Sequence, residues 1–204
     1  MRRIVLLLVV AAIVVSGALW GGRAWLSERD RQKTIAAMLD HADELRRTEQ
    51  GLSPAAVEFK KALVLAPDDV RALRGLGEVE LRLSQIPDAI NHLRRAEELA
   101  DPEEKATIQL SLGRALTERY RGSGNDADFR AAHNAFLEAR QNPSVEPEAL
   151  EAYGALFLEK GHNFNVDKAL TTFDELLKKY PDHPVSTGVR ALVAELRHEA
   201  SKGG

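Results

Sequence analysis

The segment "AAVEFKKALVLAP", residues 55–67, combines a regular apolar pattern with a closing proline, and this combination decides the fold. Spacings of 4, 3 and 5 residues separate Ala55, Phe59, Ala62 and Pro67. Residues three and four apart lie on one face of an α-helix, and a proline shortly after such a run is typical of a helix end. The segment therefore predicts an amphipathic helix that ends before Pro67.

The same pattern returns three more times along the chain. The second copy begins 34 residues after the first, at Ala89, Leu93 and Ala96, and closes at Asp101-Pro102. The third copy is Ala132, Phe136 and Ala139 with Pro143, and the fourth is Ala169, Phe173, Leu176 and Pro181. A recurrence at this period indicates a solenoid built from one repeated supersecondary unit.

Glycines recur in the helices that lie between these segments. The stretch "RALRGLGEVE", residues 71–80, places Gly75 and Gly77 inside what otherwise reads as a helix. Because glycine there costs about 0.8–1.0 kcal/mol relative to alanine, it needs a structural reason. A large residue followed by glycine recurs at 76–77, 112–113 and 153–154, which favours a close helix crossing. A phosphate-binding loop would need a preceding strand and a third glycine, and Gly75 stays unexplained.

These elements together resemble the tetratricopeptide repeat (TPR), a helix–turn–helix unit of 34 residues. The resemblance covers about residues 36–183 as four units. It implies an all-α, TPR-type α-solenoid of about four helical hairpins. Small residues should face each other where the helices of a unit cross, at Gly77, Gly113, Gly154, Ala55, Ala89, Ala132 and Ala169. Larger side chains should fill the space between units, at Phe59, Leu93, Phe136 and Phe173.

Local signals add detail to this division. Ser53-Pro54 predicts a helix N-cap followed by proline. About seven extra residues at 121–127 predict a flexible turn in which Asp126 or Asp128 caps the next helix, and Asn165 is expected to cap the following one. Residues 184–199 predict a final helix, with Val185, Val189, Leu192 and Leu196 on one side, that caps the open end of the stack.

The N-terminus carries a charge-free run, Ile4 to Trp20, which Gly21 and Gly22 extend. As a helix the run spans roughly 26 Å, close to the roughly 30 Å of a hydrocarbon core. Residues 1–27 are therefore expected to be an uncleaved transmembrane signal anchor that contacts the membrane through residues 4–22. A signal peptide cleaved near Ser16-Gly17-Ala18 is the alternative.

Flanking charge predicts the orientation of this segment. The preceding Arg2 and Arg3 favour a cytoplasmic N-terminus. The chain would then be a single-pass inner (cytoplasmic) membrane protein whose C-terminal domain is periplasmic. The expected organisation is an anchor over residues 1–27, a TPR domain over 28–183, and a capping helix with a flexible tail over 184–204.

Composition argues against several classes of function. The chain has no cysteine, which excludes disulfides, thiolate metal sites and cysteine nucleophiles. Its net charge of −3 and the absence of a long basic run argue against nucleic acid. No two of the six histidines have metal-ligand spacing. We therefore expect no enzyme, no cofactor, no bound metal and no small-molecule substrate.

The resemblance implies that the first helix of each unit lines a concave groove for a protein or peptide partner. The matching positions are Arg71, Arg74, Glu78, Leu81, Thr107, Leu110, Arg114, Thr117, Glu148, Glu151, Ala155 and Leu158. They change from basic to acidic along the groove. They lack the Lys and Asn of the family's carboxylate-clamp subtype, so chaperone C-termini are not expected as ligands.

The function expected from these features is a membrane-anchored TPR scaffold or adaptor that assists the assembly or quality control of envelope complexes. Two alternatives remain open at this point. One is a fixed structural subunit of a large membrane complex, with Gly17, Gly21 and Gly22 packing against a neighbouring helix. The other is a secreted soluble TPR binding protein, released by signal cleavage.

Overall fold

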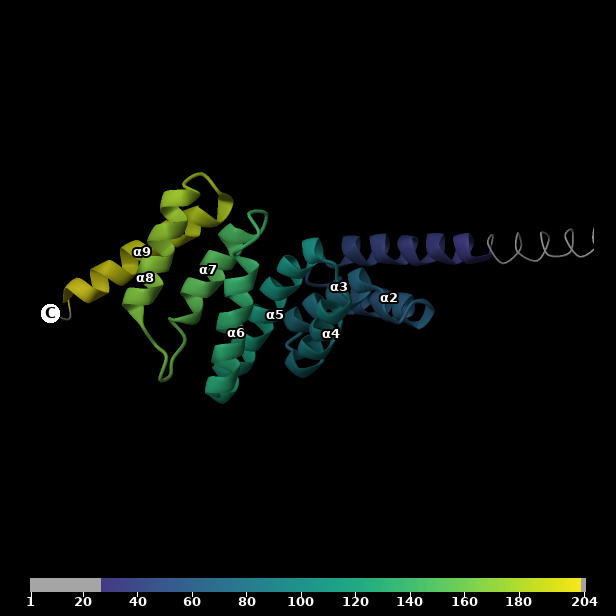
Figure 1. Cartoon of the computed structure of the whole chain (residues 1–204), viewed down its shortest axis with the longest axis horizontal. Helices are drawn as coiled ribbons and strands as arrows, with labels where there is room; N and C mark the ends of the chain where they lie inside the picture. The colour runs from purple at the N-terminus through teal and green to yellow at the C-terminus, as the bar shows by residue number, and fades with distance from the viewer. Residues whose placement is uncertain (1–26, 203–204) are drawn as a thin grey trace, which may run out of the picture.

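The computed structural model describes residues 27–202, which form a row of stacked helices (Figure 1). Residues 27–45 are helical and lead into α2 (Leu52–Leu65), α3 (Val70–Arg82), α4 (Ile86–Leu99), α5 (Pro102–Ser123), α6 (Asp126–Ala139), α7 (Glu146–Leu156), α8 (Val166–Lys179) and α9 (Pro184–Lys202). No strand occurs within residues 27–202. The prediction of an all-α, TPR-like solenoid is confirmed.

The expected membrane segment at residues 4–22 lies outside the described residues, as do residues 203–204 of the expected tail. Among the helices of residues 27–202, none combines the length and the apolar character needed to cross a bilayer.

Helix contacts reveal which face of the stack is concave. From α2 to α9 each helix packs on the next, and α3 also contacts α5, α5 contacts α7, and α7 contacts α9. Within α2–α9, no corresponding contact joins α2 to α4, α4 to α6, or α6 to α8. The first helices of the units therefore lie closer together than the second helices. The stack curves around them, and α3, α5, α7 and α9 line its inner side.

The glycines of the later units make room for aromatic rings. A Cβ atom on Gly113 would lie 2.5 Å from Cε1 of Phe136, and one on Gly154 would lie 2.7 Å from Cδ1 of Phe173. Both rings are fully buried and belong to the second helix of the same unit. They therefore pack the two helices of one hairpin together, and each ring also borders the space between its unit and the following helices, Phe136 between α5 and α7 and Phe173 between α7 and α9.

The two glycines of α3 make contacts in two different units. A Cβ atom on Gly77 would lie 2.7 Å from Cγ of Leu93 and 3.2 Å from the carbonyl oxygen of Ala89, both on α4 of the same unit. A Cβ atom on Gly75 would collide with the ring of Phe59, which comes from α2 of the preceding unit. Two glycines within three residues thus let α3 approach a helix on each side.

Helix boundaries differ from the prediction at two connections. Helix α2 begins at Leu52 with Gly51 as its N-cap, so Ser53 lies within the first turn and does not cap it. Helix α5 continues to Ser123, and only residues 124–125 connect it to α6. The extra residues therefore lengthen α5 instead of forming a flexible turn.

The caps of α6 and α8 follow from these boundaries. Asn125, and not Asp126 or Asp128, caps α6 by accepting a hydrogen bond from the backbone N–H of Ala127. Asp128 is buried and pairs with Arg119 at 2.5 Å. Asn165 caps α8 as predicted, accepting from the N–H of Lys168 at 2.9 Å.

A buried carboxylate gives the stability of the N-terminal half a dependence on pH. Glu80 on α3 is 1% exposed, and its carboxylate lies 2.7 Å from Nδ1 of His92 on α4 and 3.8 Å from Nζ of Lys60 on α2. The hydrogen bond with Glu80 raises the pKa of His92 above its usual value, although burial opposes this effect. The stabilisation by protonated His92 is complete below the unfolded pKa of about 6.5. It is lost as the pH rises through the folded pKa.

We therefore expect His92→Gln to lower the free energy of unfolding most below about pH 6.5, with the difference from the wild type shrinking as the pH rises. Urea unfolding followed by far-UV circular dichroism at several pH values measures this difference. A difference that stays constant, or that grows with pH, would contradict the coupling to Glu80.

Candidate functional site

Two adjoining hollows lie on the inner side of the stack, at its C-terminal half. The larger, about 360 Å³, lies between α7 and α9, with Phe173 at its floor. The smaller, about 180 Å³, lies between α5 and α7 and includes Arg114 and Thr117. Glu151 and Ala155 on α7 border both hollows. We call this continuous surface the inner trough.

The sequence of α9 explains why the trough is apolar at this end. Pro184 begins the helix, and Val185, Val189 and Leu192 follow at spacings that place them on the side facing α7. Val189 is 3% exposed, whereas Val185 and Leu192 remain half-buried. Gly188 adds no side chain, and a Cβ atom there would meet nothing within 4 Å. A partner's apolar side chain can therefore be accommodated between α7 and α9.

The opposite end of the inner side is occupied by ion pairs within the chain. Arg71 pairs with Asp40 at 2.7 Å and with Asp43 at 2.5 Å, both on the helix at residues 27–45. These hydrogen bonds raise the pKa of Arg71, first through Asp43, so the guanidinium stays charged and paired. The expectation of a basic groove end is therefore wrong. Carboxylates of the preceding helix neutralise the charge of this arginine.

Glu78 is engaged in the same way. It pairs with Arg46, directly after the helix at residues 27–45, and with Arg74 at 3.2 Å, and it accepts a hydrogen bond from Ser111 Oγ at 2.9 Å. These contacts link three successive first helices. Arg71 and Glu78 thus hold neighbouring units together, and Arg74 pairs with Glu78 within α3, which reduces the charge that this end offers to a partner.

The remaining predicted groove residues separate into three groups. Leu110 and Thr117 are buried on α5, and Thr117 donates its hydroxyl hydrogen to the carbonyl of Gly113 at 2.8 Å. Half-buried positions outside the trough are Leu81, Thr107, Glu148 and Leu158. Arg114, Glu151 and Ala155 meet at the trough, where Nη2 of Arg114 lies 3.7 Å from Oε2 of Glu151. The site therefore centres on the last two units.

Sequence reasoning missed Phe173, Val185 and Leu192 as trough residues. The sequence marks Phe173 as a repeat position and predicts that the apolar side of α9 is a capping surface. The apolar spacing in 185–192 was a usable signal, but it does not show that part of this side remains uncovered.

Comparison with known proteins agrees with this geometry. A family model described as tetratricopeptide repeat matches residues 39–104 and 125–184, which together make up more than half of the chain. The chain belongs to the tetratricopeptide repeat family. A TPR chain of this kind provides a scaffold suited to protein–protein interaction.

Individual relatives cover different shares of this TPR chain. The protein CTR9 homolog of Arabidopsis thaliana is 30% identical over 126 residues, which are 62% of this chain but only 11% of that relative. The pilF structure of Pseudomonas aeruginosa has a TM-score of 0.66 at 20% identity, over 85% of this chain and 72% of that one. A structure of MamA has a TM-score of 0.57 at 24% identity, and the match covers 79% of this chain and 88% of that one. These structural likenesses show the fold.

Proposed function

We propose that this TPR chain is a membrane-anchored adaptor that holds a partner polypeptide in the inner trough. The observation that carries the proposal is the trough itself, an apolar hollow of about 360 Å³ on the inner side between α7 and α9. Hollows of this kind take up the apolar anchor residues of protein partners. Binding, with no catalytic step, is the activity proposed.

The chemistry around the hollow supports one kind of partner. Val185 and Leu192 offer apolar surface, while Arg114 and Glu151 stand at the rim, 45% and 42% exposed and 3.7 Å apart. A pair this exposed and this long is weak, so it can exchange for contacts with a partner. The partner we propose is a polypeptide segment with an apolar anchor side chain and flanking charged residues.

The cellular placement is proposed from the sequence of residues 4–22. The apolar run is long enough to cross a bilayer and follows Arg2 and Arg3. Anchoring would keep the TPR domain beside the membrane and raise its effective concentration near partners in envelope complexes. In this orientation the domain is extracytoplasmic.

Filling the hollow should abolish partner capture. We expect Ala155→Arg to remove the envelope proteins that copurify with the full-length chain from detergent-solubilised membranes, because the new side chain occupies the trough. Val64→Arg is the matched control, since Val64 is 81% exposed on α2, a second helix. Far-UV circular dichroism verifies that both variants are folded. Retention of the same partners by Ala155→Arg would overturn the assignment of the trough.

Reporter fusions at Gly204 test the placement. We expect a phosphatase fused there to be active and a fluorescent protein that requires the cytoplasm to be dark. The opposite pair of results would overturn the proposed orientation. Recovery of the fusion in the soluble fraction would overturn the anchor.

A further inference from the structure

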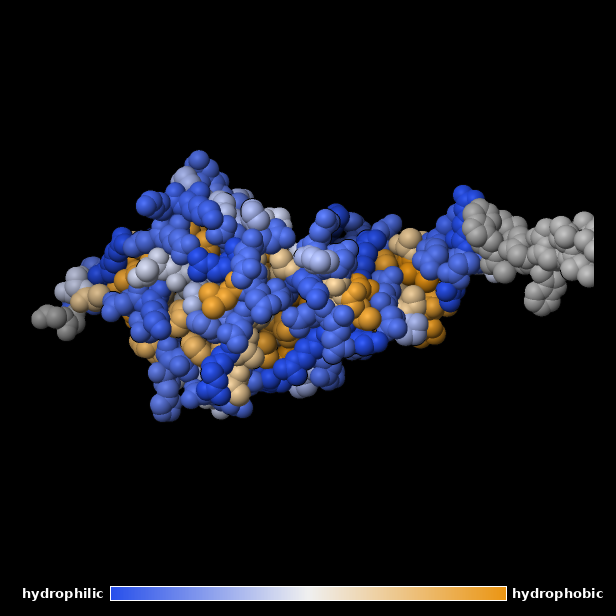
Figure 2. All heavy atoms as spheres, in the orientation of Figure 1, coloured by the Kyte–Doolittle hydropathy of each residue, from blue (hydrophilic) through white to orange (hydrophobic). Residues whose placement is uncertain are grey.

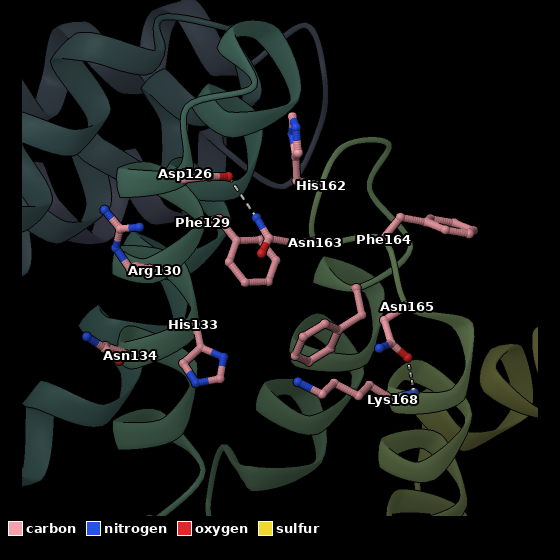
Figure 3. A pocket seen from close by; sticks show the side chains of 11 residues that line it. Asp126, Phe129, Arg130, His133, Asn134, His162, Asn163, Phe164, Asn165 and Lys168 are labelled. Carbon is pink, nitrogen blue, oxygen red and sulfur yellow. Dashed lines mark hydrogen bonds between the residues drawn. The ribbon is translucent and has the colours of Figure 1, made fainter.

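A separate pocket of about 550 Å³ lies between α6, the connection after α7, and the start of α8 (Figure 3). Arg130 and His133 line it from α6, Phe164 from the connection, and Lys168 from α8. Since α6 and α8 are second helices, the pocket lies away from the inner trough. It contains none of the groove positions expected from the family.

Aromatic rings form the floor of this pocket. The ring centroids of Phe129 and Phe157 lie 5.7 Å apart in an edge-on arrangement, and both residues are buried. His133 stands 6.2 Å from Phe157, again edge-on. Phe164 is 52% exposed at the rim. The pocket therefore offers aromatic surface to a flat group.

The charged side chains that line the pocket are mostly basic. In the described part of the chain, Arg130 and Lys168 form no ion pair, whereas their neighbours Arg119 and Arg140 pair with Asp128 and Glu175.

The ammonium group of Lys168 lies 5.3 Å from the centroid of the Phe157 ring. Asp126 is the single carboxylate among the lining residues, and its Oδ1 accepts a hydrogen bond from Nδ2 of Asn163 at 2.9 Å. Two cations and one carboxylate thus line this pocket, in a chain whose net charge is −3.

His133 contributes a shielded polar atom. Its Nδ1 is buried without a hydrogen-bond partner, and Figure 3 shows its ring and the Lys168 ammonium group facing each other. Burial, and then the charge of Lys168, lower the pKa of His133, which favours the neutral form of its ring.

We propose that this pocket binds an anionic group, a phosphate or a carboxylate, carried on a flat aromatic body. Arg130 and Lys168 supply the counter-charges, and arginine is suited to bind either group through two parallel hydrogen bonds. The aromatic body packs against Phe129 and Phe157. His133 lines the same pocket beside Lys168.

Calorimetric titration of the full-length chain in a non-ionic detergent with phenyl phosphate tests the site. We expect Arg130→Gln and Lys168→Gln each to weaken binding about fivefold, the effect of one partly exposed charged contact. Arg94→Gln is the matched control, because Arg94 is exposed on α4 and also forms no ion pair within residues 27–202. Absence of binding, or equal weakening by Arg94→Gln, would overturn the proposal.

Further ligands separate the sources of the anion. Binding of benzoate at least as tight as that of phenyl phosphate would assign the site to carboxylates, and tighter binding of phenyl phosphate would assign it to phosphates. Inorganic phosphate should bind more weakly than phenyl phosphate, and equal binding would overturn the role of the aromatic floor.

The imidazole signals of His133 in NMR spectra provide an independent readout. The charged and titratable groups around it are Lys168, Arg130, Asp126, His162 and Tyr153. A bound anion should raise the pKa of His133 in the wild type. An unchanged pKa under saturating ligand would place the ligand outside this pocket and overturn the proposal.

Discussion

Phe173→Ala is expected to lower the free energy of unfolding by about 3–5 kcal/mol, the usual cost of removing a buried aromatic ring. The ring is 0% exposed and lies in the core that joins the last two units to α9. It also fills the space that Gly154 leaves on α7, so the variant loses both apolar contacts and the packing of the hairpin.

Phe164→Ala is the matched control for this loss. The same side chain is removed, but from a position that is 52% exposed in the connection before α8. The expected change is within about 0.5 kcal/mol. Urea unfolding followed by far-UV circular dichroism measures both variants, and similar losses from the two would contradict the buried role of Phe173.

Gly154→Ala is expected to lower the free energy of unfolding by about 1–3 kcal/mol, although alanine normally favours a helix. The new methyl group would lie 2.7 Å from Cδ1 of Phe173, a ring that is 0% exposed. Either the ring or the backbone of α7 and α8 must therefore shift. The same unfolding measurement gives the loss.

Gly188→Ala should change the free energy of unfolding in the opposite direction. Gly188 lies within α9, and a Cβ atom there would meet nothing within 4 Å. The helix propensity of alanine should then raise the free energy of unfolding by up to about 1 kcal/mol. A gain in stability from both substitutions would show that Gly154 does not mark a close helix crossing.

The double variant Gly154→Ala with Phe173→Leu isolates the contact. If the ring and the missing side chain occupy complementary space, the smaller leucine should relieve part of the crowding. The two changes should then be non-additive by about 0.5–3 kcal/mol, as for residues in contact. Additive losses would argue that each residue acts on a different part of the core.

The helix order and the repeat register could be predicted because each depends on residues within one unit. The spacing of Ala55, Phe59 and Ala62 places one side of α2 in the core, and the same spacing recurs in α4, α6 and α8. The spacing of apolar residues along a helix shows directly which of its faces is buried. The register therefore follows from local sequence alone.

Features that depend on contacts between units could not be predicted in this way. Gly75 is explained by Phe59, and the charge of Arg71 is neutralised by Asp43, in each case from the preceding unit. The continuation of α5 to Ser123 was also missed, because Gly122 and Gly124 suggest a loop. Gly124 in fact closes the helix in the left-handed conformation, with φ of 66°.

Neither proposed binding surface could be predicted from the sequence, for related reasons. The inner trough exists because α9 leaves part of its apolar side uncovered, which depends on how α9 packs against α7. In the pocket between α6 and α8, Asp126 precedes Arg130 by one helical turn, and this spacing suggests an ordinary ion pair. The structure instead bonds Asp126 to Asn163 and leaves the arginine available.

Site-specific photo-crosslinking in native membranes compares the inner and outer surfaces most directly. A photoreactive amino acid is placed at Leu192, half-buried in the inner trough, or at Val64, 81% exposed on α2. If the trough holds a partner polypeptide, position 192 should give a discrete adduct that Ala155→Arg removes, and position 64 should give none. Adducts from position 64 alone, or adducts from 192 that persist in Ala155→Arg, would contradict binding in the trough.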